Sequence, residues 1–157
     1  MVWKPNVTVA AVIERAGRFL FVEERIRDAL VLNQPAGHLE RGETLEQAVI
    51  RETLEETAYS FTPVGLIGIY RWPHPERDLT YLRFAFHGPV SGPEPGRALD
   101  TGVVRALWLS PDELAAESTR HRSPQVALCV EHYLQGQRFP LTLLHDVALT
   151  TSSPPCA

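Results

Sequence analysis

The chain contains little cysteine and no long apolar run, and each shortage excludes a class of protein. Its 157 residues include two cysteines, Cys129 and Cys156, whose separation fits neither a metal site nor a redox motif. A disulfide framework is therefore not expected, and a reducing cytoplasm is the predicted location. No apolar run approaches the roughly 20 residues that a membrane-spanning helix needs. Residues 1–12 lack the cleavage pattern of a signal peptide, so we expect no membrane partner.

Positive charge is also scarce. The 15 Lys and Arg residues are outnumbered by 19 Asp and Glu residues, which leaves a net charge of −4. Such a surface disfavours a nucleic-acid polymer as partner, whereas a small phosphorylated molecule can bind when a metal neutralises its charge. Lys4 is the single lysine, and the other fourteen basic residues are arginine. Arginine suits bidentate phosphate contacts, although genomic base composition is the simpler explanation for the bias.

The length and the composition, 44% hydrophobic and 22% charged, fit one soluble globular domain. The expected strands cover residues 6–14, 19–24, 30–34, 61–72, 79–87 and 103–109. A Gly- and Pro-rich stretch over 88–102 is predicted to be a surface loop. Residues 149–157 are predicted to form a disordered tail.

Three helices are predicted. Thr44, with Gln47 three residues later, forms a capping box that opens the first helix. Residues 110–113 form a second capping box with proline at the first helical position. Residues 123–133 are expected to form the third helix. Strands on both sides of a central helix, followed by further helices, are typical of an α/β domain with a mixed sheet.

The most informative stretch begins at Gly37 and ends in three glutamates. Glu52, Glu55 and Glu56 follow the spacing i, i+3, i+4, which places their carboxylates on one helix face, about one turn apart. Like charges so placed repel, and the helix macrodipole adds about 0.3–1 kcal/mol of penalty for each carboxylate at this end. A solvated acidic surface does not explain that cost. A divalent cation such as Mg²⁺ does, because hard ions take oxygen ligands.

The same stretch resembles the Nudix box, the signature of the Nudix family. The signature fixes one Gly, one Arg and four Glu by their separations. In this chain they are Gly37, Glu43, Arg51, Glu52, Glu55 and Glu56. Six fixed positions match by chance in about one of 10⁵ chains of this length. Thr53 departs from the signature, which has an aliphatic residue there, and Ala58 replaces a glycine that would permit a tight backbone.

This resemblance implies a Nudix-type α/β/α sandwich over residues 3–145 and an enzyme that cuts phosphoanhydride bonds. The implied ligands of Mg²⁺, or of Mn²⁺ in its place, are Glu52, Glu55, Glu56 and the backbone carbonyl of Ala36. Arg51 is implied to hold the glutamates for catalysis, and Gly37 and Glu43 to be structural. The general base would be a glutamate or a water, and the resemblance leaves this open.

A further acid outside the box often stands a few residues before a late tryptophan in this family. Here the tryptophan is Trp108, and the position five residues before it holds Val103, which cannot ionise. Asp100 is the nearest acid. A turn residue in a Gly-rich loop is its simpler interpretation.

The resemblance extends to the NudJ-type bacterial phosphatases of the family. It is carried by the segments WKPNVTVAAVI, LNQPAGHLE, LRFAF and RSPQVALCVEHYLQGQRFPL. Those enzymes remove a terminal phosphate from nucleoside tri- and diphosphates, and act on thiamine diphosphate and its pyrimidine diphosphate precursor. Two alternatives stay open: a pyrophosphohydrolase that releases pyrophosphate or cleaves ADP-ribose-like nucleotide sugars, and a nucleotide sensor that does not cut. The complete glutamate trio argues against the sensor. Both a monomer and a homodimer fit the sequence.

Four residues outside the box are predicted to contact the substrate. Asn33 and Gln34 have the donors and acceptors to bind a heteroaromatic ring, or equally to satisfy loop backbone. Trp72 can stack on a ring, although an aromatic residue on a strand is more often in the core. Arg83 lies in an apolar strand, where an unpaired charge is costly. It must pair with an acid or face the phosphates, and we favour the second.

Overall fold

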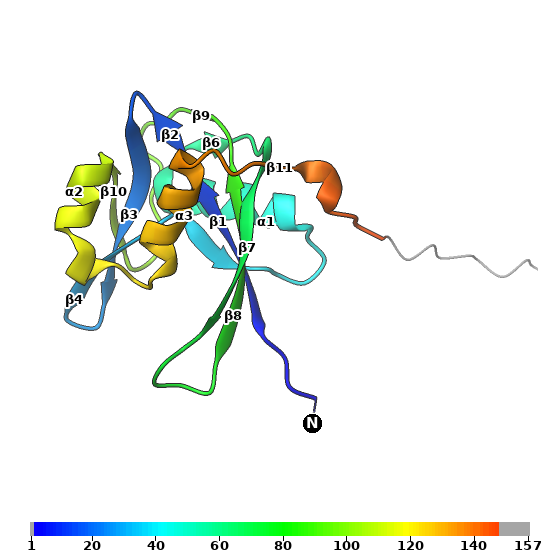
Figure 1. The fold of residues 1–157 in the computed structure, drawn as a ribbon. Coiled ribbons are helices and arrows are strands. Elements are labelled where there is room, and N and C mark those ends of the chain that lie inside the picture. The colour runs from blue at the N-terminus through cyan, green and yellow to red at the C-terminus, as the bar shows by residue number, and fades with distance from the viewer. Residues whose placement is uncertain (1, 148–157) are drawn as a thin grey trace, which may run out of the picture.

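The computed structural model of the protein describes residues 2–147, in which three sheets are flanked by helices (Figure 1). The strands are β1 (Asn6–Val12), β2 (Glu14–Arg15), β3 (Arg18–Ile26), β4 (Ala29–Asn33), β5 (Ala36–His38), β6 (Ser60–Phe61), β7 (Gly65–Pro73), β8 (Thr80–His87), β9 (Val90–Ser91), β10 (Val103–Leu109) and β11 (Phe139–Pro140). The helices are α1 (Leu45–Thr57), α2 (Pro111–Ala116), α3 (Gln125–Leu134) and the 3₁₀ turns η1 (Ser118–Arg120) and η2 (Leu141–Leu143). The predicted disordered tail, 149–157, lies outside the described residues.

The largest sheet is mixed, as the sequence predicted. Its five strands follow the order β11-β7-β8-β1-β5. Strand β1 pairs in parallel with β8 and antiparallel with β5. A second sheet joins β10, β3 and β2, with β4 paired to β3, and β6 and β9 form a short third sheet. The hairpin of β7 and β8 extends beyond the body of the domain (Figure 1).

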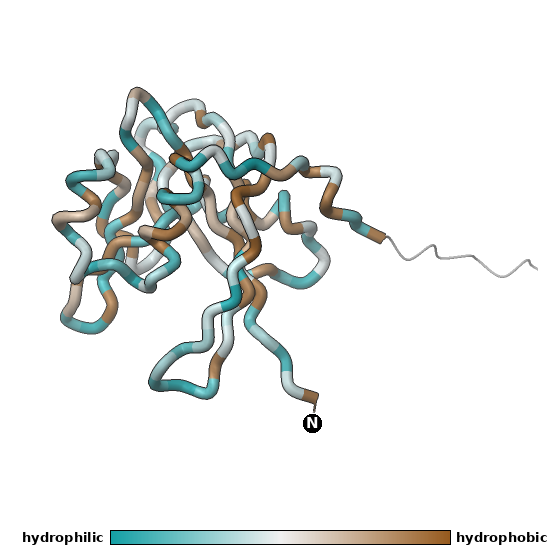
Figure 2. Tube along the Cα trace, in the orientation of Figure 1, coloured by the Kyte–Doolittle hydropathy of each residue, from teal (hydrophilic) through white to brown (hydrophobic). Residues whose placement is uncertain are grey.

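Side-chain alternation along the strands divides the core into two apolar layers. Val9 packs in the cluster that contains Val49 of α1, whereas Val12 and Phe21 pack in the cluster that contains Val126 of α3. Successive strand residues point to opposite faces, so each sheet face needs its own cover. Apolar segments accordingly concentrate in the strands at the centre of the molecule (Figure 2). The result is the predicted α/β/α sandwich, with α1 on one side and α2 and α3 on the other.

Helix α1 begins and ends on identifiable caps. The Thr44 side chain accepts from the backbone N–H of Gln47, and the Gln47 side chain accepts from the backbone N–H of Thr44, so the predicted capping box is present. The helix ends at Ala58, which adopts the left-handed conformation (φ 61°, ψ 10°) and donates its N–H to the carbonyl of Leu54. This is the position at which the signature has glycine.

Several predicted boundaries were wrong. The strand expected over 61–72 divides into β6 and β7, because Pro63 lies between them and has no N–H for pairing. The loop expected over 88–102 contains β9, which pairs with β6. The third helix begins at Gln125 rather than at 123, since Pro124, already in helical conformation, takes the N-cap position without a side-chain cap. Within residues 2–147 no helix has the length and hydropathy needed to cross a membrane.

Ala58→Gly is expected to raise the free energy of unfolding by about 0.5–1 kcal/mol. The left-handed conformation strains a residue that has a Cβ, and the gain exceeds the extra entropy that glycine brings to the unfolded chain. Urea denaturation measures the change. The matched control is Ala115→Gly on the exposed side of α2, which should lower stability by about 1 kcal/mol. A destabilised Ala58→Gly protein would contradict this account.

Candidate active site

Arg51 on α1 forms hydrogen bonds with three acidic side chains of the predicted site. Its Nε and Nη2 donate to the two carboxylate oxygens of Glu43, at 3.0 and 2.7 Å. Its Nη1 donates to Glu52 at 2.8 Å and to Glu55 at 3.1 Å, and its Nη2 also reaches the carbonyl of His38 at 3.0 Å. All five N–H donors of the guanidinium are therefore used. A lysine cannot reproduce this arrangement.

Glu56 is buried, with 7% of the residue exposed, and no basic side chain among the described residues stabilises its ionised form. Its Oε2 accepts from the backbone N–H of Ala36 at 2.9 Å. In the described part of the chain no Lys, Arg or His pairs with it. Burial raises the pKa of the Glu56 carboxyl to about 9, and the negative charges of Glu24, Glu52 and Asp100 raise it further. The site therefore holds more negative charge than its protein surroundings stabilise.

Gly37 is required for a close approach rather than for an unusual backbone conformation. A Cβ at this position would overlap the carboxylate of Glu52. Burial raises the pKa of Glu52, while the bond and charge of Arg51 oppose the shift. Any larger residue at position 37 would displace the Glu52 carboxylate.

The N–H and carbonyl of Ala36 point away from β1. Its partner in β1 is Ala10, and the adjacent pair of Ala11 and Pro35 is joined by a backbone hydrogen bond of 2.9 Å. Because antiparallel strands alternate bonded and non-bonded pairs, Ala10 and Ala36 form a non-bonded pair. The N–H of Ala36 is therefore free to bind Glu56, and its carbonyl faces the same side as that N–H.

The three glutamates lie on one face of α1, as predicted, but different groups bind their carboxylates. Glu52 and Glu55 are held by Arg51, and Glu56 is held by Ala36. Among residues 2–147 no three acidic, histidine or cysteine side chains stand close enough to hold a metal by themselves. A metal bound at this site must take further oxygens from backbone, water or substrate phosphate, as Mg²⁺ commonly does.

The loop before β10 brings Asp100 to the end of α1. Its backbone N–H donates to the carbonyl of Glu55 at 3.0 Å, and its own carbonyl accepts from Val103 at 3.0 Å, which is the turn the sequence indicated. The charge of its carboxylate is close enough to raise the pKa values of Glu52 and Glu56. Asp100 is thus both a turn residue and part of the acidic surroundings.

Glu24, an acid on β3 whose charge also acts on Glu56, was not predicted from the sequence. Burial raises the pKa of Glu24, and the charges of Arg122 and Arg83 oppose the shift. The feature that could have identified Glu24 from the sequence is its charge within the apolar strand FLFVEERI. A charge within an apolar strand is costly, and this cost led us to select Arg83. Glu24 has the same cost for the same reason.

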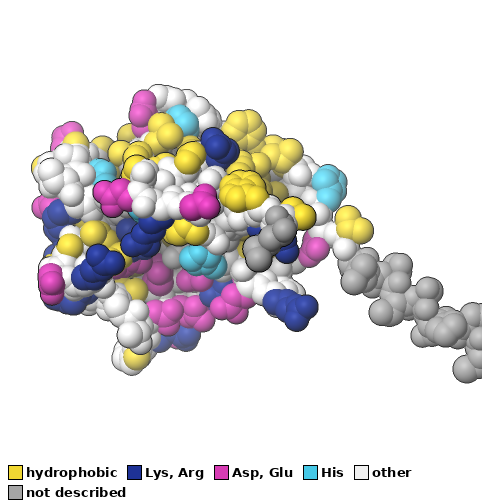
Figure 3. All heavy atoms as spheres, turned by 90° about the horizontal axis from the view of Figure 1, so that it is seen from below, with side chains coloured by type: hydrophobic (Ala, Val, Ile, Leu, Met, Phe, Trp, Pro, Cys, Tyr) yellow, Lys and Arg dark blue, Asp and Glu magenta, His cyan; other side chains and the backbone are white. Residues whose placement is uncertain are grey.

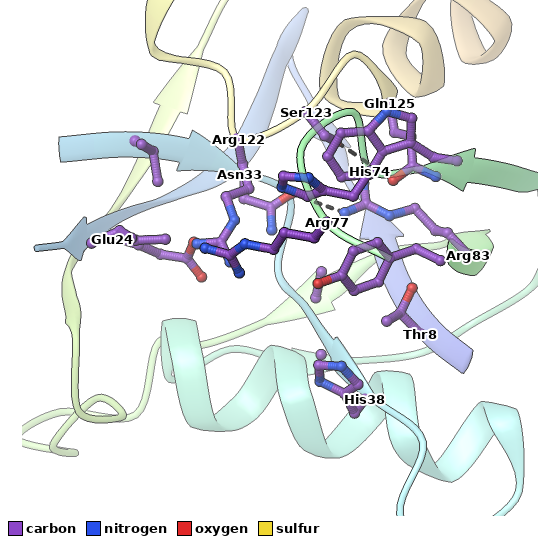
Figure 4. A pocket seen from close by; sticks show the side chains of 16 residues that line it. Thr8, Glu24, Asn33, His38, His74, Arg77, Arg83, Arg122, Ser123 and Gln125 are labelled. Carbon is purple, nitrogen blue, oxygen red and sulfur yellow. Dashed lines mark hydrogen bonds and ion pairs between the residues drawn. The ribbon is translucent and has the colours of Figure 1, made fainter. Parts of the chain in front are cut away.

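A cavity of about 450 Å³ opens beside β5. The hairpin of β7 and β8 contributes Trp72 and Tyr81 to its wall, and β5 contributes Ala36 and Gly37. Strand β3 contributes Glu24 (Figure 4). Since Ala36 binds Glu56 and Gly37 contacts Glu52, strand β5 joins the cavity to the glutamates. Seen from the side of the hairpin tip, acidic and basic side chains lie next to one another on this face of the molecule (Figure 3).

Arg83 is buried and binds two amide side chains. Its Nη1 donates to Gln34 at 3.1 Å and its Nη2 to Asn33 at 3.2 Å. No carboxylate lies within 4 Å of it in the part of the chain described, so the acid partner considered from sequence is replaced by these amides. Gln34 also donates to the carbonyl of Val126 at 2.7 Å and does not line the cavity, whereas Asn33 and Arg83 do.

Trp72 lies on the cavity wall rather than in the core. Its ring stacks on Tyr81, with centroids 5.7 Å apart and planes at 21°. Both residues are partly exposed and face the cavity. The stacking position predicted for Trp72 is therefore available to a ligand.

Comparison with known proteins identifies the family of the chain. Residues 3–128 match the family model of the NUDIX domain. The chain is 40% identical over 144 residues to the phosphatase NudJ of Escherichia coli (strain K12), which covers 92% of this chain and 93% of that protein. The structure of a NUDIX hydrolase from Nitrosomonas europaea is 54% identical, with a TM-score of 0.90 over 92% of this chain and 98% of the other.

A MutT NUDIX hydrolase from Burkholderia pseudomallei shares the fold alone, at 22% identity and a TM-score of 0.69 over 83% of this chain and 98% of the other. The domain match covers most of the chain, and the relatives at 40% and 54% identity cover nearly all of it. The chain therefore belongs to the Nudix family of hydrolases, enzymes that act on phosphorus-containing acid anhydrides.

Proposed function

We propose that the protein is a Mg²⁺-dependent phosphatase of the NudJ type. Its substrates would be nucleoside tri- and diphosphates, together with thiamine diphosphate or its pyrimidine diphosphate precursor, and its product would be orthophosphate. The similarity to NudJ over 92% of the chain supports this reaction. The observation that carries the proposal is strand β5, which contacts Glu52 and Glu56 and also lines the cavity.

The residues present suit a hard divalent cation. Glu52 and Glu56 supply carboxylate oxygens, Glu55 lies one turn away, and the carbonyl of Ala36 faces α1. These are the ligands that Mg²⁺ and Mn²⁺ prefer. The uncompensated burial of Glu56 and the close fit of Gly37 around the Glu52 carboxylate support a cation site at this position.

When bound, Mg²⁺ would supply positive charge that offsets the diphosphate and the transferring phosphoryl group. The protein's own contribution is orientation. Arg51 fixes Glu52 and Glu55, and Glu43 fixes Arg51. Glu55 has 34% of its side chain exposed, compared with 12% for Glu52, so it is the glutamate most open to water. We assign Glu55 as the base that accepts the proton of the attacking water.

Product analysis separates this function from the alternatives. The protein is incubated with Mg²⁺ and GTP, GDP, thiamine diphosphate or ADP-ribose. Orthophosphate, with GDP appearing from GTP, supports the proposed phosphatase. Pyrophosphate, or AMP from ADP-ribose, would assign the protein to another Nudix activity.

Glu56→Gln is expected to lower kcat by about 10²–10³-fold, because the amide removes a charge from the cation site. Its fold should persist, since the side chain keeps an oxygen for the N–H of Ala36. The matched control is Glu46→Gln, which changes a glutamate on the first turn of the same helix and should retain activity. Near-wild-type turnover by Glu56→Gln, or full activity in EDTA, would argue against the metal site.

Gly37→Ala is expected to lower kcat/KM by about 10²-fold with little loss of stability. The added methyl group displaces the carboxylate of the flexible Glu52 side chain and leaves the backbone in place. The substitution should therefore misplace a site residue without unfolding the protein. Phosphate release and thermal unfolding are measured on the same preparation. A variant that unfolds without loss of specific activity would contradict this assignment.

The metal-free protein is expected to lose stability as the pH rises from 4.5 to about 9. In this window the folded state keeps a proton on Glu56 that the unfolded chain has released, because the pKa is 4.5 unfolded and about 9 folded. Mg²⁺ requires the ionised carboxylate, so the stabilisation it gives should increase with pH. Thermal unfolding in EDTA and in Mg²⁺ tests both trends. In metal-free Glu56→Gln the loss of stability with rising pH should be smaller than in the wild type. An unchanged loss would exclude Glu56 as its cause.

A further inference from the structure

We infer that Glu24 and Gln125 determine substrate specificity by hydrogen bonding a heteroaromatic ring in the cavity beside β5. This inference rests on the proposed function and extends it to the part of the substrate that is not hydrolysed. It starts from three buried side-chain atoms that have no hydrogen-bond partner among residues 2–147, namely Glu24 Oε2, Arg83 Nε and Gln125 Nε2. All three belong to residues that line this cavity.

Gln125 at the start of α3 presents a free donor. Only 5% of the residue is exposed. Its Oε1 accepts from the hydroxyl of Ser123 at 3.4 Å, which leaves the Nε2 amide group as the end without a partner. A buried N–H without a partner costs stability, and an apolar residue of similar size would avoid that cost. A ligand acceptor would satisfy it.

Glu24 on β3 presents a free acceptor. Its Oε2 is buried, has no hydrogen-bond partner and lies 3.7 Å from Nη1 of Arg122. That separation is too long for a hydrogen bond, so Arg122 offsets part of the charge without using the oxygen. A ligand N–H would use it.

The third atom, Nε of Arg83, has a different explanation. The guanidinium of Arg83 also interacts with the buried thiol of Cys129. The other nitrogens of Arg83 hold the oxygens of Asn33 and Gln34. Arg83 therefore holds wall residues of the cavity in position. The two remaining groups without partners, which a ligand could bind, are those of Glu24 and Gln125.

The aromatic lining of the cavity favours a flat ligand. Trp72 and Tyr81 stack with each other on adjacent strands, and the ring centroids of His74 and Trp72 are 5.2 Å apart, so the hairpin presents an aromatic surface. Aromatic side chains bind planar rings by stacking. The complementary ring carries an N–H donor for Glu24 and a ring nitrogen or carbonyl for Gln125. Amino-substituted pyrimidines and purines have this chemistry.

The test compares ring-bearing and ring-free phosphoanhydrides. Phosphate release is measured with GTP, CTP and thiamine diphosphate, and with inorganic tripolyphosphate, which has no ring. The quantity compared is kcat/KM for the ring-bearing substrate divided by kcat/KM for tripolyphosphate. In Glu24→Gln and in Gln125→Leu this ratio should fall about 10- to 100-fold for the preferred substrate. In Gln135→Leu, an exposed glutamine at the other end of α3, it should not change.

Thermal unfolding without substrate gives a second measurement that does not depend on activity. Gln125→Leu should unfold at a higher temperature than the wild type, because it removes a buried donor without a partner. A lower melting temperature, or an unchanged ratio in both variants, would overturn the inference. Failure of the wild type to hydrolyse even tripolyphosphate would count against the proposed function, and a higher melting temperature of Gln125→Leu would then still support the free donor.

Discussion

The guanidinium of Arg51 is the constraint on which the rest of the site depends. It joins Glu43, from the loop before α1, to Glu52 and Glu55 on the helix itself. Without it, the repulsion between carboxylates one turn apart would favour rotamers that point into water. Because each of its five N–H groups has an assigned partner, the guanidinium fixes the loop and the helix at the same time. The spacing of Glu43, Glu52 and Glu55 in the signature thus fits a single planar cation.

Several residues around this centre lie in environments that lower the stability of the free protein. Glu56 is buried without a cation, Glu24 and Gln125 keep polar atoms without partners, and Ala58 holds a strained conformation at the end of α1. The first three of these residues surround the cavity and β5, and each would be satisfied by a cation or a ligand. Burial that is costly in the free protein is useful in binding, because the groups are oriented before the ligand arrives. Ala58 has no such explanation.

The sequence predicted local structure more reliably than contacts between distant segments. The capping box at Thr44 and the spacing of the box residues depend on local geometry, so α1 and its acidic face were predictable. Substrate contacts depend on which strands become neighbours. Arg83 was correctly singled out as unusual, yet its partners are Asn33 and Gln34, some fifty residues earlier in the chain. Glu24 escaped notice because nothing in its own strand indicates that Glu56 lies nearby.

The sequence by itself determined the family, the α/β/α class and the set of charged residues on α1, since each depends on residue type at fixed separation. Only the tertiary structure decided that β5 lies between the glutamates and a cavity, and that the β7–β8 hairpin supplies its aromatic wall. It also decided that Glu24 and Gln125 line the cavity while Gln34 does not. Spacing along a helix is set by covalent geometry, whereas the neighbours of a strand are set by packing of the whole chain.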